Sequence, residues 1–279
     1  MTKKHLEIKG LKKYYGSFPA VRGVDLELAR GEVVVIMGPS GCGKSTVIRS
    51  INRLVEPTAG EIYFDGIPVH SLKPEQLAPL RRRIGFVFQN FNLIQRLTAL
   101  ENVMLGLVYA GLDKKVARRL AEEALAKVGL LSAADKLPRE MSGGQQQRIG
   151  IARALAFQPE LMLWDEPTAS LDPILVREVL DVMEELVRST GTTMLIVTHE
   201  VPFALRVADR ILLMAEGKVI EEGAPAEIFQ APTSEVGRKY LEIINSEAKD
   251  VAEISRRILQ PRRSEGKLLP QAGECIESA

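Results

Sequence analysis

The sequence predicts an α/β fold that has a parallel-sheet core, an N-terminal antiparallel β subdomain and an inserted α-helical subdomain. Three observations predict it. Apolar and polar residues alternate near the N-terminus, short continuous apolar runs follow, and the stretch between two of these runs is mainly helical. We expect one domain over residues 1–245, with the helical insert at roughly 90–158, and a C-terminal extension over 246–279.

The N-terminal strands come first. Leu6 and Ile8 alternate with polar residues, as a half-buried strand requires, and a second alternating run surrounds Leu26. Residues 33–37 are a continuous apolar run that ends in glycines, and a helix-compatible stretch follows at 44–54. A buried strand, a Gly-rich turn and a helix predict the opening of a parallel α/β sheet.

The remaining elements repeat the same β-α-β order. In the insert, Asp113 is predicted to cap a helix that runs to about Val128, with Val116 and Ala124 on its apolar face. Two more buried strands are predicted at 161–164 and 193–198, separated by a helix over 174–188.

The C-terminal extension differs in composition from the rest. Val251, Ile254 and Ile258 follow a helical spacing, which predicts one short amphipathic helix that Pro261 would end. Beyond this proline we expect loop or disorder.

Composition limits the class of protein. The chain has 279 residues, of which 46% are hydrophobic and 26% charged, and its net charge is +1. This balance is ordinary for a soluble globular protein and gives no reason to expect a nucleic-acid partner. The longest stretch without strongly polar residues is 103–112, about half the length of a membrane-spanning helix. Two cysteines fit a reducing cytoplasm.

The strongest local signal is a phosphate-binding loop after the first buried strand. It fills the template G-x-x-x-x-G-K-[ST] with Gly38, Pro39, Ser40, Gly41, Cys42, Gly43, Lys44 and Ser45, followed by Thr46. The glycines let backbone N–H groups turn toward a phosphate at a helix N-terminus. We expect Lys44 to reach the β- and γ-phosphates of a nucleotide and Ser45 to ligate Mg²⁺. Cys42 is expected to be a small filler.

Two adjacent carboxylates end the buried strand at 161–164. Asp165 is placed to bind Mg²⁺, directly or through water, and Glu166 to act as the general base on an attacking water. A solvated acidic strand end before the Pro167 turn is the alternative, and the upstream loop argues against it.

A second phosphate-binding device is predicted where the insert ends. Ser142 and Gln145 form the capping box S-x-x-Q at a helix start. Gly143 and Gly144 occupy the first turn and leave backbone N–H groups bare, which favours anion binding.

In these motifs the chain resembles the ATP-binding subunits of ABC transporters over residues 5 to about 245. Ser142–Gln145 matches the family signature, with Met141 where leucine is usual. The resemblance assigns four further roles. Gln89 would be the Q-loop glutamine that senses metal and water, and 170–172 with Asp172 would be the D-loop. His199 would be the switch histidine, and Tyr15, with Tyr14 as a rival, the aromatic that stacks on adenine.

This resemblance also implies partners and a cycle. Two copies associate head to tail, ATP on one loop is covered by the signature of the other, and hydrolysis reopens the dimer. The chain would lie peripherally on the cytoplasmic face of a membrane, held by transmembrane permease subunits and acting indirectly with an extracytoplasmic solute-binding protein. Phe88, Phe91, Leu93 and Ile94 either form the groove for a permease helix or pack the insert. Arg81–Arg83 is expected to be a solvated loop face.

Within the family, the chain is most similar to subunits that import polar amino acids. The segments 91–93, 100–103 and 165–185 carry this similarity, whereas 94–96 and Ala169-Ser170 depart from it. The alternatives are a phosphonate-type importer, a lipoprotein-release or cell-division complex and, more remotely, a non-transport ATPase that acts on DNA or ribosomes.

Overall fold

The computed structural model describes residues 4–245. By its internal contacts the chain divides into two units, residues 1–241 and 242–279. The first unit contains all the elements described below. Of the second unit only residues 242–245 are described, so the short helix predicted around Val251–Ile258 lies outside the described residues.

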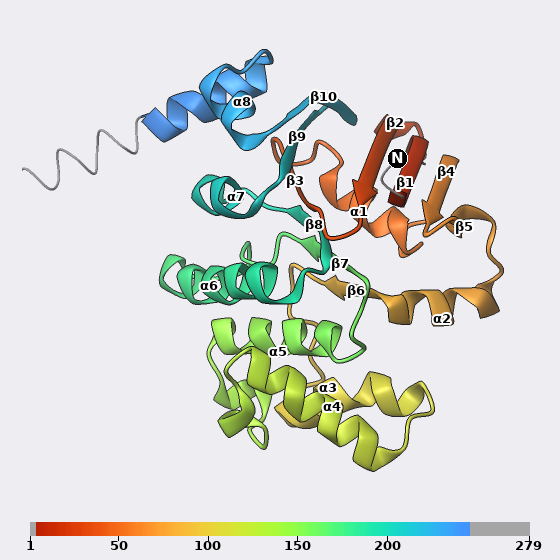
Figure 1. The fold of residues 1–279 in the computed structure, drawn as a ribbon, viewed down its shortest axis with the longest axis vertical. Helices are drawn as coiled ribbons and strands as arrows, with labels where there is room; N and C mark the ends of the chain where they lie inside the picture. The colour runs from red at the N-terminus through yellow and green to blue at the C-terminus, as the bar shows by residue number, and fades with distance from the viewer. Residues whose placement is uncertain (1–3, 246–279) are drawn as a thin grey trace, which may run out of the picture. The chain divides into compact units, whose positions relative to one another are not determined.

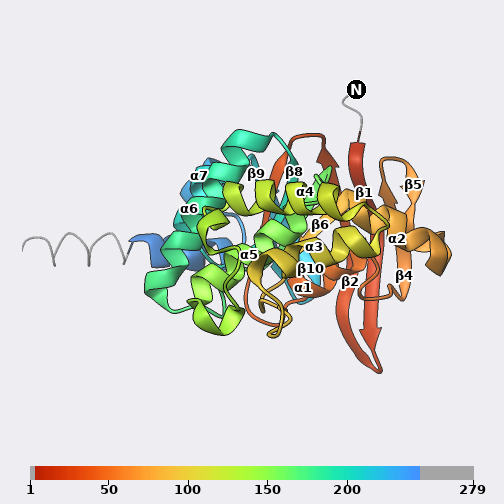
Figure 2. The same cartoon turned by 90° about the horizontal axis from the view of Figure 1, so that it is seen from below.

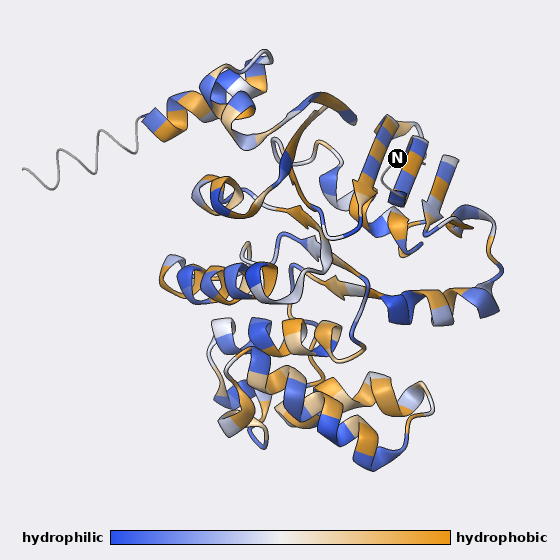
Figure 3. Ribbon diagram, viewed as in Figure 1, coloured by the Kyte–Doolittle hydropathy of each residue, from blue (hydrophilic) through white to orange (hydrophobic). Residues whose placement is uncertain are grey.

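Four antiparallel strands form the N-terminal sheet, in the order β2-β1-β4-β5. Their bounds are β1 Lys4–Tyr15, β2 Phe18–Ala29, β4 Ala59–Phe64 and β5 Ile67–Pro68. The predicted alternation is confirmed around Ile8 and Leu26, which are buried while their neighbours are more exposed, whereas Leu6 is buried together with His5 before it. Figure 3 shows this alternation as changing colour along β1 and β2.

Six strands form the central sheet, in the order β10-β9-β3-β8-β7-β6. Their bounds are β3 Val33–Met37, β6 Ile84–Val87, β7 Leu161–Asp165, β8 Thr193–Val197, β9 Arg210–Ala215 and β10 Lys218–Gly223. All pairings are parallel except β9 with β10. Every residue of β3, β7 and β8 is buried, which explains their continuous apolar runs. The expected α/β fold with a parallel core is confirmed.

Helices surround the central sheet and form the insert (Figure 1). Their bounds are α1 Lys44–Ile51, α2 Pro74–Arg83, α3 Ala99–Tyr109, α4 Lys114–Lys127, α5 Gly143–Leu155, α6 Pro173–Thr190, α7 Val201–Val207 and α8 Pro225–Gln230. The helices α3, α4 and α5 come between β6 and β7 in the chain and pack on one another, as both views show (Figures 1 and 2). No helix of residues 4–245 is long and apolar enough to cross a membrane.

Two sequence-based details need correction. Asp113 caps α4 as predicted, but Val116 is exposed and the buried face is centred on Ala117, Ala121 and Leu125. Small alanines let α4 approach α3 and α5 closely, which larger side chains at these positions would prevent. The second detail is the cluster Arg81–Arg83, which forms the last turn of helix α2 instead of a loop.

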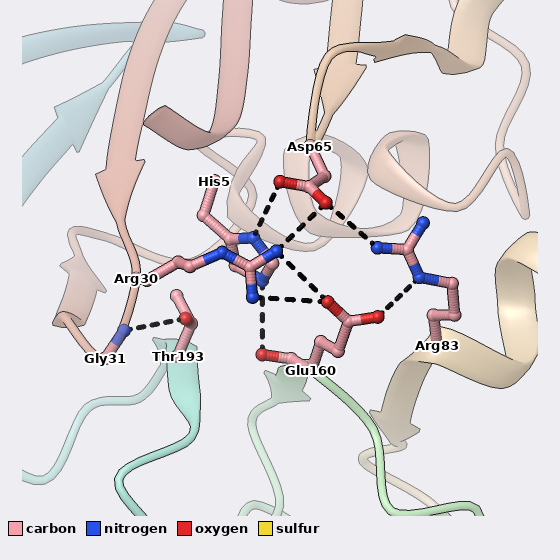
Figure 4. A network of polar contacts seen from close by, with 7 residues as sticks. All are labelled: His5, Arg30, Gly31, Asp65, Arg83, Glu160 and Thr193. Atoms are coloured by element: carbon pink, nitrogen blue, oxygen red, sulfur yellow. Dashed lines mark hydrogen bonds and ion pairs between the residues drawn. The ribbon is translucent and has the colours of Figure 1, made fainter. Parts of the chain in front are cut away.

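A polar network joins the two sheets (Figure 4). Arg30, which follows β2, pairs with Asp65 at 2.9 Å and with Glu160 at 3.2 Å. Arg83 at the end of α2 contacts the same carboxylates, at 3.2 Å and 2.5 Å. Burial lowers the pKa of His5, so the imidazole is neutral, and its Nε2 donates to the Glu160 carbonyl at 3.2 Å. The network fixes the antiparallel sheet against the N-terminal ends of β6 and β7, whereas the candidate site residues lie at the opposite ends of these strands.

Candidate functional site

The phosphate loop lies between the end of β3 and the start of α1, as its motif predicts. Its conformation requires glycine at two positions. Gly38 has φ 147°, and a Cβ there would lie 2.1 Å from the Met214 carbonyl oxygen. Gly43 has φ 105°, and its Cβ would lie 2.4 Å from the Ala20 carbonyl oxygen. Backbone of β9 and β2 therefore closes on the loop so tightly that no side chain fits.

A cavity of about 260 Å³ opens above the loop. It is lined by Tyr15, Phe18, Ala20, Ser40, Gly41, Gly43, Lys44, Ser45, Thr46 and Glu166. The lining thus combines most of the predicted phosphate loop with one aromatic and one carboxylate of the predicted site. Cys42 is buried beside it, and burial raises the pKa of its thiol, which fits the predicted role as a filler.

Lys44 is the buried cation of this cavity. Its Nζ donates to the carbonyls of Gly38 at 2.9 Å and Pro39 at 3.1 Å, and it lies 3.4 Å from Glu166 Oε1. These carbonyls hold the ammonium group at the loop. A phosphate in the cavity would compete for the same three donors, so the lysine is positioned for the predicted contact.

Asp165 ends β7 at 0% exposure and is held by Arg49 of α1. Arg49 Nε donates to its Oδ2 at 2.6 Å, whereas Oδ1 has no hydrogen-bond partner among the described residues. A buried carboxylate oxygen without a partner is costly unless something else binds it. Arg49 was not predicted from the sequence. Its position one turn after Ser45 on the same helix is the signal that could have indicated it.

Glu166 and His199 face each other across the ends of β7 and β8. His199 Nε2 lies 2.9 Å from Glu166 Oε1. The hydrogen bond with His199, helped by the charge of Lys44 and opposed by burial, lowers the pKa of Glu166. The carboxylate is therefore ionised at neutral pH, as a base must be. Glu166 has φ 47°, and its N–H donates to the Val197 carbonyl at 3.0 Å, so the turn after β7 is firmly placed.

The Q-loop and D-loop lie next to each other. Ser170 Oγ donates to Asn90 Oδ1 at 3.0 Å, which links the residue after Gln89 to the segment before Asp172. Asp172 is the exposed N-cap residue of α6. Neither Gln89, His199, Asp165 nor Asp172 lines the cavity.

Ser142 caps α5 with the reciprocal bonds that the capping box predicts. Its Oγ accepts from the Gln145 N–H at 3.2 Å, and its own N–H donates to Gln145 Oε1 at 3.0 Å. Gly143 packs near Leu171 of the D-loop, since its Cβ would lie 3.2 Å from that side chain. None of the residues 142–145 lines the cavity at the phosphate loop of the same chain.

Two aromatic rings stand at the mouth of the cavity. Tyr15 is 50% and Phe18 60% exposed, and the two residues are cross-strand partners in the β1–β2 hairpin. Tyr14 does not line the cavity, which favours Tyr15 of the two candidates. Lys13 Nζ lies 5.0 Å from the centre of the Tyr15 ring. Phe18 was not predicted, although its place across the hairpin from Tyr15 could have indicated it.

A second cavity, of about 190 Å³, lies beside the Q-loop. It is lined by Asn52, Leu54, Arg81, Arg82, Ile84, Gly85, Phe86, Phe88, Arg153, Ala154 and Phe157. Of the four apolar residues expected around a groove, Phe88 lines it, while Phe91, Leu93 and Ile94 do not. Phe91 lies instead near Gly143, where its ring atom would be 3.6 Å from an added Cβ.

Comparisons with known proteins agree with this geometry. Residues 21–169 match the family described as ABC transporter. The glutamine transport ATP-binding protein GlnQ of Escherichia coli (strain K12) is 47% identical over 86% of this chain and 100% of its own length. The glutamate transport ATP-binding protein GluA of Corynebacterium glutamicum is 47% identical over 85% of this chain and 97% of its own.

A solved structure is similar as well. The dimeric structure of MJ0796, a bacterial ABC transporter cassette, superposes with a TM-score of 0.72 at 40% identity, covering 79% of this chain and 98% of that one. The phosphate loop, the two carboxylates at the end of β7 and the capped α5 therefore occur together in a fold shared with such cassettes. The chain belongs to the ABC transporter family, of which it is an ATP-binding cassette.

Proposed function

We propose that this chain, as a cassette over residues 1–245, binds and hydrolyses ATP to power an ABC importer of a polar amino acid. The observation that carries the proposal is the cavity in which the phosphate loop and Lys44 face Glu166. The amino-acid class is supported by the 45–47% identity to glutamine, glutamate and cystine transport proteins. Tyr15, with Phe18 across the hairpin, would stack on the adenine.

Mg²⁺ fits the residues beside the cavity. Asp165 Oδ1 is a buried oxygen without a partner in the described part of the chain, and the Ser45 hydroxyl lines the cavity. Oxygen donors of this kind suit Mg²⁺, and Gln89 would complete the set with phosphate oxygens. The ion would neutralise negative charge on the phosphates. No group of three or more His, Cys, Asp or Glu side chains within residues 4–245 forms a separate metal site.

Glu166 would act as the general base and His199 would contact the γ-phosphate. The two side chains bond to each other, so each would release the other before acting on ATP and water. Glu166→Gln keeps the shape of the side chain but removes the base. ATP turnover should therefore fall by about 100-fold or more, while ATP affinity is retained. Near-normal turnover of Glu166→Gln would contradict the assignment.

The signature residues would complete the site of a second copy. In one chain the helix start at Ser142 and the phosphate loop do not line one cavity. We therefore propose a head-to-tail dimer in which Ser142, Gly143, Gly144 and Gln145 cover the partner's ATP, with Asp172 at the same interface.

Mixing two inactive variants tests the shared site. Lys44→Ala disables the loop and Ser142→Arg blocks the signature, so neither homodimer has a whole site. In a mixed dimer the intact loop of one chain meets the intact signature of the other, and hydrolysis should return. Pull-down of one tagged chain with the other must first show that mixed dimers form. Proven mixed dimers with no hydrolysis above either parent would contradict a shared site with independent halves.

Permease subunits would hold the cassette peripherally at the cytoplasmic face of the membrane. The cavity beside the Q-loop, lined by Phe86, Phe88 and Phe157, is the proposed groove for a permease helix. In reconstituted vesicles the complex should need an external solute-binding protein for full ATPase activity. Full stimulation by a lipoprotein or another membrane-embedded substrate, without a binding protein, would indicate extraction instead of import.

A further inference from the structure

The first residue of the phosphate loop is hydrogen-bonded to the last helical segment of the compact unit. Tyr240 lies on the segment that is helical from residue 235, and its hydroxyl accepts a bond of 3.2 Å from the Gly38 N–H. Gly38 is buried, so its N–H needs a partner, and losing one would leave a costly unsatisfied group. The acceptor comes from a residue 202 positions further along the chain.

Tyr240 is itself held firmly. Its ring meets the edge of Phe229 of α8, with ring centres 6.3 Å apart and planes at 85°. The start of its helix is anchored on β10, because the Glu221 carboxylate accepts the N–H groups of Thr233 at 2.7 Å and Ser234 at 3.0 Å. Burial raises the pKa of the Tyr240 phenol, so the hydroxyl stays neutral.

Gly38 makes one hydrogen bond through its carbonyl and one through its N–H, and bound nucleotide would break only the first. Its carbonyl accepts the bond from Lys44 Nζ at 2.9 Å, which Lys44 must give up to reach a phosphate. The bond to Tyr240 engages the opposite group of the residue and does not compete with phosphate. Gly38 itself has no room for a side chain that could fix the loop, because a Cβ there would clash with the Met214 carbonyl.

We propose that Tyr240 is a positioning residue whose hydroxyl holds the phosphate loop in its nucleotide-ready conformation and so couples the helical segment 235–241 to nucleotide binding. The proposal rests on the nucleotide site described above. Apparent affinity falls with the fraction of protein whose loop is correctly placed. The coupling is reciprocal, so bound nucleotide stabilises the docked helix in turn.

Tyr240→Phe tests the hydroxyl alone, because it keeps the ring against Phe229. We expect the Kd for Mg-ADP and the KM for ATP to rise about three- to tenfold, the range of one ordinary hydrogen bond. The kcat should stay unchanged, since the hydroxyl does not touch the reacting atoms. Amide exchange at Gly38 should be faster in the variant. Tyr109→Phe, on a side chain that is 91% exposed, is the matched control and should change none of these values.

The results for Tyr240→Phe and Lys44→Ala together separate the possibilities. Tyr240→Phe with wild-type Kd, KM and Gly38 exchange overturns the proposal. A lower melting temperature with unchanged Kd overturns it too, because the hydroxyl is then only structural. Lys44→Ala is measured alongside. If Lys44→Ala loses ADP binding while Tyr240→Phe does not, only the role of Tyr240 fails; if Lys44→Ala keeps full affinity, the proposed nucleotide site fails as well.

Discussion

Breaking the Arg49–Asp165 pair should destabilise the protein more than breaking a surface pair. Asp165 is 0% exposed and accepts from Arg49 Nε at 2.6 Å, while its other oxygen has no partner within the described residues. In Arg49→Met the carboxylate therefore keeps no protein partner. A hydrogen bond to a charged group contributes about 1.5–3 kcal/mol, and breaking a fully buried ion pair costs about 3–5 kcal/mol.

Because Arg49 is partly exposed, the expected loss in the free energy of unfolding is smaller than that for a fully buried ion pair. Its side chain is 38% exposed, so water replaces part of the interaction and limits the cost. We expect the free energy of unfolding to fall by about 2–3 kcal/mol, which corresponds to a drop in Tm of about 5–10 °C for a domain of this size. Arg49→Lys keeps the charge but not the directed Nε–H and should lose an intermediate amount.

Urea unfolding without nucleotide measures this loss against a matched control. Arg177 pairs with Asp181 at 3.7 Å on the surface of α6, and their side chains are 83% and 62% exposed. Arg177→Met should change the free energy of unfolding by no more than about 0.5 kcal/mol. If the two Arg→Met variants lose equal stability, the burial of Asp165 does not determine the strength of its pair, and the reasoning is refuted.

Three further predictions concern the loop, the base and the network. Gly43→Ala should weaken ADP binding by at least about 100-fold in calorimetry, because its Cβ would strike backbone 2.4 Å away. Gly16→Ala, with φ 60° and no atom within 4 Å, should cost only about 1–2 kcal/mol of stability. The hydrogen bond with His199 lowers the pKa of Glu166 in the folded protein below its ordinary value of 4.5. The ionised carboxylate therefore stabilises the fold at any pH above 4.5, and this stabilisation is lost as the pH falls through the lower pKa of the folded state. Urea unfolding of the protein and of Glu166→Gln from about pH 6 to 3 should show this difference disappearing. Glu160→Gln should lower the free energy of unfolding by about 1–2 kcal/mol without changing kcat, since it weakens the network of Figure 4 away from the cavity.

Much of the site was predictable because its chemistry is local in the chain. The glycines of 38–43 predict a loop that only glycine can form, and the structure places them at positive φ or against backbone. The capping box at Ser142 formed as predicted, since it needs only one helical turn. The strand before Asp165 was visible as an apolar run because both of its faces are buried.

The sequence-based predictions are wrong where one residue pattern is compatible with two local structures. The helical spacing predicts Val116 and Ala124 on the buried face of α4. The structure buries Ala124 but exposes Val116, and Ala117, Ala121 and Leu125 complete the buried face. Hydrophobicity alone favours the larger side chain, whereas close helix packing favours the smaller one. Three charges in a row are typical of a solvated loop, whereas the structure places Arg81–Arg83 in the last turn of α2, where Arg83 pairs with Asp65 and Glu160.

The sequence by itself determined the family, the fold class and the residues expected to bind nucleotide, because each depends on short motifs and on the periodicity of apolar residues. The tertiary structure alone decided which side chains hold those residues in place. Arg49 on Asp165 and Tyr240 on Gly38 join positions 116 and 202 residues apart. No local propensity relates such distant positions, since their contact follows only from how the strands and helices pack.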